Sequence, residues 1–217
     1  MIPLRDTIPS ARVPVVTYAI IIANVVVFLY EVSLSHAAQK HFIEAYGLVP
    51  AHFRFSNLLT SMFLHGGWGH IIFNMLFLYI FGDNVEDRLG HARYAAFYLL
   101  CGMAAGGAQA VVNPGSRIAM VGASGAIAGV LGAYLLFFPR SRIVTLVPIF
   151  FFLQIVEIPA VLFLFGWFIL QILSGMATIG AADTAGVAFF AHVGGFIAGM
   201  VLGPVLRERR ASVPTWV

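Results

Sequence analysis

The sequence predicts an all-α membrane protein built from six transmembrane helices. Hydrophobic residues make up 60% of the 217 residues and charged residues only 10%, whereas charged residues make up about 25% of an ordinary soluble domain. The mean hydropathy is +0.94. Six apolar segments come close to the roughly 20 residues that a membrane-spanning helix needs. They lie at residues 14–34, 68–83, 93–112, 124–138, 157–175 and 187–206, and we expect residues 1–217 to form a single helical membrane domain.

Polar side chains cluster at the entrance to the second segment. His65, His70 and Asn74 lie there, after a loop at about residues 35–60 that we expect to lie partly in the membrane interface. His70 and Asn74 are four residues apart and therefore share one helix face. Polar groups inside a membrane are costly and usually face a cavity or the bundle interior, which favours a functional role. Hydrogen bonds between packed helices are the alternative explanation.

A metal site is a further alternative, since His65, His70 and His192 could each supply an imidazole ligand. Such a site would need an accompanying general base, and no suitable carboxylate is apparent in the apolar segments. Cys101 in the third segment is the only cysteine, which excludes an internal disulfide and a cysteine-based metal cluster. We therefore expect Cys101 to pack within the bundle, and we expect neither a metal nor another cofactor.

Ser124 opens the fourth segment, in a Gly-Ala-Ser-Gly-Ala run that starts at Gly122. A hydroxyl group inside an apolar segment can serve as a nucleophile when a base activates it. The run is a weak signal by itself, because small residues four apart, such as Gly125 and Gly129, also occur wherever membrane helices pack tightly. The motif alone therefore leaves helix packing as the alternative.

The apolar stretch at residues 143–175 is too long for one crossing, because about 33 residues at roughly 1.5 Å each would extend about 50 Å against a hydrocarbon core of about 30 Å. Pro148 and Pro159 divide it. We interpret residues 143–156 as a buried or interfacial entry segment. The fifth helix is expected to start near Glu157, because an acid and a proline suit a first turn. Glu157 is therefore interpreted as a helix-end residue rather than a proton relay.

His192 lies in the sixth segment and shares one helix face with Gly195 and Gly199. This face combines a titratable side chain with a close-approach surface, so the fourth and sixth segments can bring a serine and a histidine to hydrogen-bond distance. A neutral imidazole is well suited to accept the proton of a serine. No acid is well placed to complete a triad, since Asp183 lies on the loop side. The residues therefore predict a dyad of Ser124 and His192.

The distribution of basic residues predicts that both termini are cytoplasmic, because short loops rich in lysine and arginine stay on that side. One side then holds Arg5, Arg12, Arg88, Arg93, Arg140, Arg142, Arg207, Arg209 and Arg210, and the other holds Lys40, Arg54 and Arg117. The formal net charge of +3 is interpreted as anchoring to anionic lipid headgroups. Basic and aromatic residues do not interleave in a nucleic-acid-binding pattern, so nucleic acid is not expected as a partner.

These motifs together resemble those of the bacterial rhomboid intramembrane serine proteases, over nearly the whole chain. The resemblance is carried by His-Gly-Gly-Trp-Gly-His at residues 65–70 with Asn74, Gly-Ala-Ser-Gly at residues 122–125, and Ala-His-Val-Gly-Gly at residues 191–195 through Gly199. It implies a six-helix bundle with a short, central fourth helix. The serine of that helix would lie below the outer membrane surface, in a water-accessible cavity.

The resemblance also implies a role for each motif residue. Ser124 is the nucleophile and His192 the general base, while His70, Asn74 and the backbone N–H of Ser124 form the oxyanion hole. The supporting residues are His65, Gly122, Gly125, Gly195 and Gly199. Some family members carry an aromatic residue one turn after the serine, stacked against the histidine, whereas this sequence has Ala128 there. The sequence therefore does not predict what orients His192.

The function predicted from the sequence is a cofactor-independent endopeptidase that cleaves single-span membrane proteins within or near their membrane segment. A helical peptide bond is shielded by its own hydrogen bonds, so a substrate must unwind near the site. The fifth helix, with Trp167 and Phe168, is placed beside the substrate entry, and the protein in a bacterial inner membrane. The alternative is a non-proteolytic protein, either a transporter or a rhomboid-like protein that binds membrane clients. The sequence predicts no oligomeric state.

Overall fold

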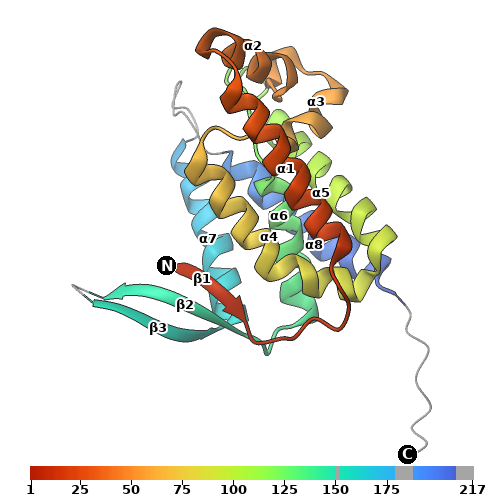
Figure 1. The fold of residues 1–217 in the computed structure, drawn as a ribbon, viewed down its shortest axis with the longest axis vertical. Helices are drawn as coiled ribbons and strands as arrows, with labels where there is room; N and C mark the ends of the chain where they lie inside the picture. The colour runs from red at the N-terminus through yellow and green to blue at the C-terminus, as the bar shows by residue number, and fades with distance from the viewer. Residues whose placement is uncertain (150–151, 179–187, 209–217) are drawn as a thin grey trace, which may run out of the picture.

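The computed structural model describes residues 1–149, 152–178 and 188–208. In chain order the helices are α1 (Val15–Ser33), α2 (His36–Tyr46), α3 (Phe55–Thr60), α4 (Trp68–Leu89), α5 (His91–Val112), α6 (Ser124–Phe137), α7 (Ala160–Thr178) and α8 (Phe189–Leu206). Two short 3-10 helices are η1 (Pro50–His52) and η2 (Ser61–Phe63). The strands are β1 (Ile2–Asp6), β2 (Arg142–Ile149) and β3 (Phe152–Pro159). Figure 1 shows an elongated helical bundle with the strands at its lower end.

The prediction of a mostly helical protein with several membrane spans is confirmed. A helix lies at each of the six predicted segments. Among the described residues, α1, α5, α7 and α8 are long and apolar enough to cross a membrane. A fifth candidate span is α4 taken with residues 55–63, which meet it at an angle of 91°. The remaining segment, α6, has only 14 residues, or about 21 Å of helix.

The short helix α6 lies at the centre of the bundle, where it packs against α4, α5, α7 and α8 (Figure 1). Its residues from Ala126 to Tyr134 are buried without interruption. A helix that is apolar on all sides is typical of such a central position. The middle of α6 is therefore covered by protein, and its N-terminal residue, Ser124, is partly buried.

The helix α4 continues to Leu89, beyond the predicted end at residue 83. The added turns carry Glu86, whose carboxylate accepts hydrogen bonds from the backbone N–H groups of Val16 at 2.9 Å and Thr17 at 2.8 Å. These N–H groups at the start of α1 have no partner within their own helix, and a carboxylate is favourable there. The buried acid thus caps α1 and joins it to α4, an arrangement that hydropathy alone does not reveal.

The all-α prediction is wrong at the lower end of the molecule, where an antiparallel sheet has the strand order β1-β2-β3. Residues 143–156, predicted to be an entry segment, form most of the β2–β3 hairpin. Glu157 is not at a helix start but in β3, with its carboxylate 3.9 Å from the guanidinium of Arg142. The helix α7 begins only at Ala160, directly after Pro159.

Local residue types explain the hairpin. Both strands are rich in β-branched and aromatic residues, which favour strands, and Pro148 lacks the N–H that a helix interior needs. The N-terminal strand β1 pairs with the free edge of β2. Asp6, at the end of β1, accepts hydrogen bonds from the hydroxyl of Tyr134 at 2.5 Å and the side-chain amide of Asn84 at 2.9 Å. The sheet is therefore tied to α6 and α4.

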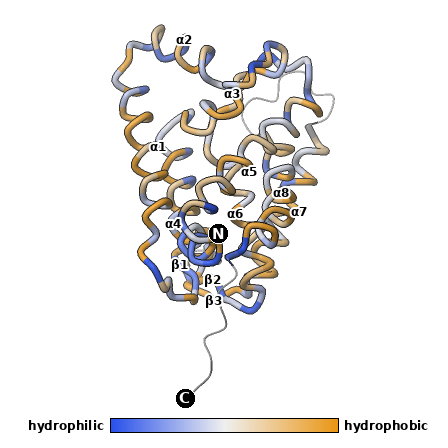
Figure 2. The backbone as a smooth tube through the Cα atoms, turned by 90° about the vertical axis from the view of Figure 1, so that its right-hand side faces the viewer, coloured by the Kyte–Doolittle hydropathy of each residue, from blue (hydrophilic) through white to orange (hydrophobic). Residues whose placement is uncertain are grey.

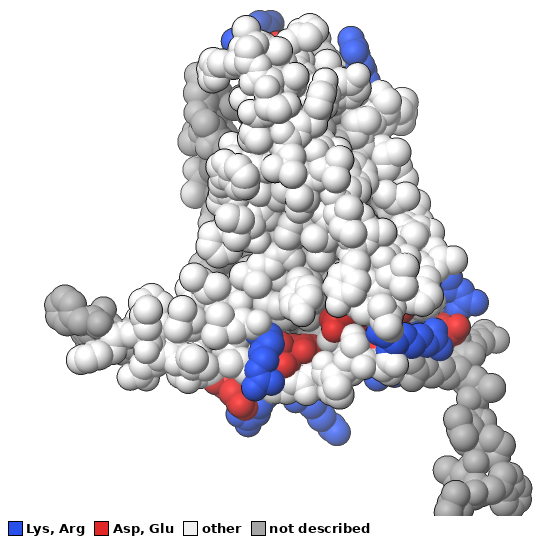
Figure 3. All heavy atoms as spheres, in the orientation of Figure 1, with Lys and Arg blue, Asp and Glu red and all other residues white. Residues whose placement is uncertain are grey.

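Charged side chains gather at the two ends of the molecule. On the face shown in Figure 3 they cluster near the strands, with a few more at the α2 end, and a broad uncharged band lies between. The tube in Figure 2 is mostly hydrophobic over the same middle band. At the strand end, Arg12 pairs with Glu208 at 3.1 Å. An apolar band between charged rims, together with the candidate spans, is the pattern of an integral membrane protein.

Candidate active site

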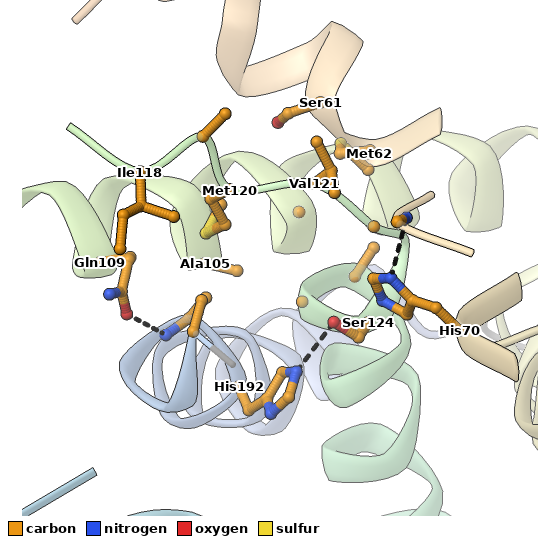
Figure 4. Close-up of a pocket in the computed structure, with 18 of the residues that line it drawn as sticks. Ser61, Met62, His70, Ala105, Gln109, Ile118, Met120, Val121, Ser124 and His192 are labelled. Atoms are coloured by element: carbon orange, nitrogen blue, oxygen red, sulfur yellow. Dashed lines mark hydrogen bonds between the residues drawn. The ribbon is translucent and has the colours of Figure 1, made fainter. Parts of the chain in front are cut away.

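The structure brings Ser124 and His192 together inside the bundle. Ser124 is the first residue of α6, and His192 lies in the first turn of α8. The Nε2 atom of His192 lies 2.8 Å from the Oγ atom of Ser124, as the dashed line in Figure 4 marks. This is a hydrogen-bond distance, and it places a base where it can take the hydroxyl proton.

Facing glycines let α8 approach α6 this closely. A Cβ atom added to Gly195 would collide with the carbonyl oxygen of Gly125, and one added to Gly199 would collide with that of Gly129. A Cβ on Gly125 would also lie 2.6 Å from the Cβ of Ala105 on α5. Backbone carbonyls cannot rotate away as a flexible side chain can. The glycine face of α8 is therefore the contact surface that sets the distance between the two helices.

The second ring nitrogen of His192 is held by a residue that the sequence analysis did not single out. Oε1 of Gln171, on α7, lies 2.7 Å from Nδ1 of His192. An amide oxygen can only accept a hydrogen bond, so this contact favours the tautomer with the proton on Nδ1, in which Nε2 can accept the hydroxyl of Ser124. Gln171 belongs to no motif in the chain. Its polarity within an apolar helix was the one available signal.

Aromatic side chains of α7 pack against α8. The rings of Trp167 and His192 lie 5.7 Å apart between centroids, and Phe168 stacks on Phe196 at 4.5 Å. Ala128, at the position where some family members carry an aromatic residue, is fully buried in α6. The aromatic contact to His192 therefore comes from α7. Trp167 and Phe168, which the sequence analysis placed beside the substrate entry, both turn their rings toward α8.

Two N–H donors lie on α4, one helical turn apart, and line the same cavity as Ser124. Nδ1 of His70 accepts a hydrogen bond from the backbone N–H of Gly66 at 3.3 Å, so its Nε2 carries the ring proton. The side-chain nitrogen of Asn74 is buried and has no hydrogen-bond partner among the described residues. Both side chains can thus donate to a group that enters the cavity.

Gly122 explains how these donors come close to Ser124. Its φ angle of 121° lies in a region that side chains disfavour. An added Cβ would lie 2.6 Å from Nε2 of His70 and 3.5 Å from the amide nitrogen of Asn74. A side chain at this position would therefore displace the ring of His70, whereas Asn74 would remain at an ordinary contact distance.

The cavity that joins these residues has a volume of about 610 Å³. It lies between α4, α5, α6 and α8 and is closed on one side by residues 116–122 (Figure 4). Gln109 on α5 accepts a hydrogen bond from the backbone N–H of Ala191 at 3.3 Å, next to His192. Such a volume is typical of ligand-binding sites.

Residues 52–209, which contain all of these side chains, match the Rhomboid domain family. This chain belongs to the rhomboid family. The rhomboid match covers most of the described bundle, from η1 to the end of α8. Only β1, α1 and α2 precede it.

Other rhomboids resemble this chain over parts of their length. The Bacillus subtilis protein YdcA, which carries the rhomboid name, is 32% identical over 124 residues, or 56% of this chain and 61% of YdcA. RHOMBOID-like protein 4 of Arabidopsis thaliana is 32% identical over 158 residues, or 70% of this chain and 34% of that protein. Rhomboid protease GluP of Bacillus subtilis is 42% identical over 78 residues, or 36% of this chain and 15% of GluP. The matched region therefore spans less than two thirds of each relative.

His65 of this rhomboid lies behind the cavity rather than in it. Its ring contacts that of His70, with centroids 5.1 Å apart, and its backbone N–H donates to the carboxylate of Glu31 at 3.0 Å. Within the described ranges, no group of three or more His, Cys, Asp or Glu side chains is placed to hold a metal ion. The geometry thus gives no support to a metal site of His65, His70 and His192. His65 is buried and contacts His70, so the structure places it next to a residue of the cavity.

Proposed function

We propose that this chain is an intramembrane serine endopeptidase that acts through a dyad of Ser124 and His192. The observation that carries the proposal is the 2.8 Å distance between the Ser124 hydroxyl and Nε2 of His192. Membership of the rhomboid family supports it, since the relative GluP is named a protease. The chemistry uses side chains and water, and it requires no cofactor.

In the proposed reaction, Nε2 of His192 takes the proton of Ser124 while Oγ attacks the carbonyl carbon of the peptide bond. The tetrahedral intermediate collapses when His192 gives that proton to the leaving nitrogen, which breaks the C–N bond and leaves an acyl group on Ser124. Water then attacks the acyl carbon, with His192 again as the base. Return of the proton to Oγ releases the second product and restores the enzyme.

The developing oxyanion needs donors that are already in place. Nε2–H of His70 and the amide group of Asn74 line the cavity beside Gly122, two residues before the nucleophile. The backbone N–H of Ser124 lies in the first turn of α6, where N–H groups have no partner within the helix. These three donors form the proposed oxyanion hole.

The proposed substrates are single-span membrane proteins. Since Ser124 begins a helix that is buried in the bundle, a peptide bond must enter the cavity as an extended segment to reach it. Backbone groups in a membrane are satisfied by helix formation, so unwinding is costly. Small or helix-weakening residues are therefore expected around the cleaved bond, and the site of cleavage is expected near the membrane boundary.

The function is tested by incubating the purified protein in lipid vesicles with a panel of single-span substrates, and by mapping any products by mass spectrometry. A reproducible cut near the membrane boundary is expected. Covalent labelling of Ser124 by a fluorophosphonate would identify the activated nucleophile independently of the substrate chosen. Binding of membrane segments without cleavage or labelling would instead favour the non-proteolytic alternative.

Loss of one oxyanion donor is expected to slow cleavage without stopping it. Asn74→Ala and His70→Ala should each lower kcat by about 100- to 1000-fold, because such donors act mainly in the transition state. The KM should change little. Because both serve one oxyanion, the double variant should lose less than the product of the two single losses. Steady-state kinetics in vesicles measures these values, and a raised KM with unchanged kcat for Asn74→Ala would remove it from the oxyanion hole.

We further propose that the single membrane domain crosses a bacterial inner membrane six times, with the strand end in the cytoplasm. The described basic residues at that end are Arg5, Arg12, Arg88, Arg93, Arg140, Arg142 and Arg207, against Lys40, Arg54 and Arg117 at the other. This excess favours a cytoplasmic strand end. The predicted cytoplasmic C-terminus falls in residues 209–217, outside the described residues.

Cysteine labelling tests this orientation. In a Cys101→Ala background, Lys40→Cys is expected to react with an impermeant maleimide added to intact cells, because α2 would face outward. Arg12→Cys should react only after the cells are opened. A reporter fused at Val217 adds the same test for the C-terminus. Labelling of Arg12→Cys in intact cells would reverse the orientation.

A further inference from the structure

His192 is held from two sides by α7, a helix that contributes no residue to the proposed dyad. Oε1 of Gln171 accepts the Nδ1 hydrogen at 2.7 Å, and the ring of Trp167 lies 5.7 Å from the imidazole ring. The hydroxyl of Ser124 occupies the remaining ring nitrogen. Both ring nitrogens of His192 therefore have a hydrogen-bond partner among the described residues.

We propose that Gln171 is the positioning residue of the active site, which fixes the tautomer and the ring plane of His192. This inference rests on the proposed function. A free imidazole places its single proton on either nitrogen, and only the form with the proton on Nδ1 can accept from Ser124. In this structure the amide oxygen of Gln171 faces Nδ1, and an acceptor in that place favours the form with the proton on Nδ1.

Gln171 is uncharged, which is favourable inside a membrane. In soluble serine proteases a buried aspartate orients the histidine, but a carboxylate in a membrane interior is costly. Both the neutral imidazole and the imidazolium carry a hydrogen on Nδ1, so Gln171 can hold the ring in both states. The imidazolium that forms during catalysis is then stabilised by a dipole rather than by a charge.

The other helices around His192 contribute groups that do not bond to Nδ1 in the described structure. The α4 helix contributes His70, a titratable group on the far side of the cavity. The α5 and α6 helices contribute the uncharged Gln109 and Ser124, of which Gln109 is bonded to the backbone of Ala191. Trp167 contributes a ring contact to the imidazole. Among the described residues, Gln171 is thus the group bonded to Nδ1.

Two substitutions of Gln171, by leucine and by glutamate, distinguish a role in positioning His192 from a role in packing α7 against α8. Gln171→Leu keeps much of the side-chain volume but removes the acceptor, and it is expected to lower kcat by about 10- to 100-fold, because small displacements of a catalytic group have effects of this size. The KM and the melting temperature should stay close to those of the wild type. The matched control is Leu170→Ala, on the exposed side of the same helix, which should leave the kinetics unchanged.

Gln171→Glu keeps an acceptor and adds a negative charge. It should retain most of the activity that Gln171→Leu loses. The carboxylate also favours the imidazolium form of His192, so the acid limb of the kcat/KM profile should move to higher pH by about one unit. If position 171 served only to pack α7 against α8, activity would not depend on a hydrogen-bond acceptor there, and Gln171→Glu and Gln171→Leu would have the same kcat.

The tautomer can be read directly, without a substrate. Nitrogen NMR of histidine-labelled protein is expected to show the Nδ1–H form of His192 in the wild type and a mixture of both forms in Gln171→Leu. An unchanged tautomer together with wild-type kcat in Gln171→Leu would overturn the proposal. If the wild-type protein cleaves nothing, the proposed function fails, whereas the tautomer measurement still decides the role of Gln171. If Gln171→Leu does not fold, the same nitrogen spectrum of the wild type decides it, because a mixture of both tautomers there would overturn the proposal.

Discussion

Replacing Ser124 with alanine is expected to abolish cleavage while the protein remains folded. The change removes one oxygen atom from the first residue of α6, and alanine is well tolerated in helices. Without Oγ there is no atom to form the acyl intermediate, so kcat should fall by about 10⁶-fold, as it does when a serine protease loses its nucleophile. Product analysis in vesicles measures the loss, and helix content by circular dichroism tests the fold.

His192→Ala is expected to match this loss, because the two residues act as one unit. Ser33→Ala serves as the control, since its exposed hydroxyl at the end of α1 bonds only to the nearby carbonyl of Tyr30 in the described structure. Wild-type turnover in Ser124→Ala would rule out the serine mechanism. Inhibition by a chelator that added zinc reverses would favour the metal site of three histidines instead.

The second large effect is expected from Gly199→Leu on α8. Any side chain at this position meets the carbonyl oxygen of Gly129 on α6, and a backbone carbonyl yields only if the helices separate. A separation of about 1 Å at the dyad can cost about 100-fold in rate, and overpacking of this kind also costs about 1–3 kcal/mol in stability. Activity is therefore expected to fall by at least about 100-fold in variants that still fold.

Gly166→Leu is the matched control for this substitution. Gly166 lies on the exposed side of α7, and an added Cβ there has nothing within 4 Å. It should leave both turnover and thermal unfolding unchanged. Normal turnover in Gly199→Leu would mean that the glycine face of α8 does not set the distance between Ser124 and His192.

The helices could be predicted from the hydropathy of the sequence, whereas the sheet could not. Each of the six helical segments is an apolar run close to the length that a membrane requires, so hydropathy finds it. Residues 143–156 are equally apolar, and hydropathy cannot tell a buried helix from a strand in such a run. The sheet is completed by Ile2–Asp6, which pairs with β2 from far away in the sequence. The end of α4 was missed for a similar reason, because Glu86 finds its hydrogen-bond partners on α1, about 70 positions away in the sequence.

The sequence likewise reveals some residues of the candidate site and not others. Ser124, His70, Asn74 and His192 stand out in the sequence because each is a polar residue in an apolar segment. Their roles remain a prediction, but the structure does place all four side chains on one cavity. Gln171 is also polar and also in an apolar helix, yet its partner lies 21 positions away across a helix boundary. No local pattern marks such a contact, so it emerges only when α7 and α8 are seen side by side.

The pairing of β1 with β2 has a practical consequence for anyone who purifies this protein. The hairpin that β1 supports ends at Pro159, and the next residue begins the helix that carries Gln171. Removing residues 2–6 would leave one edge of β2 without hydrogen-bond partners and would take away the carboxylate that Tyr134 and Asn84 bind. A purification tag is therefore best placed away from Ile2, so that measured rate constants describe α7 in its native position.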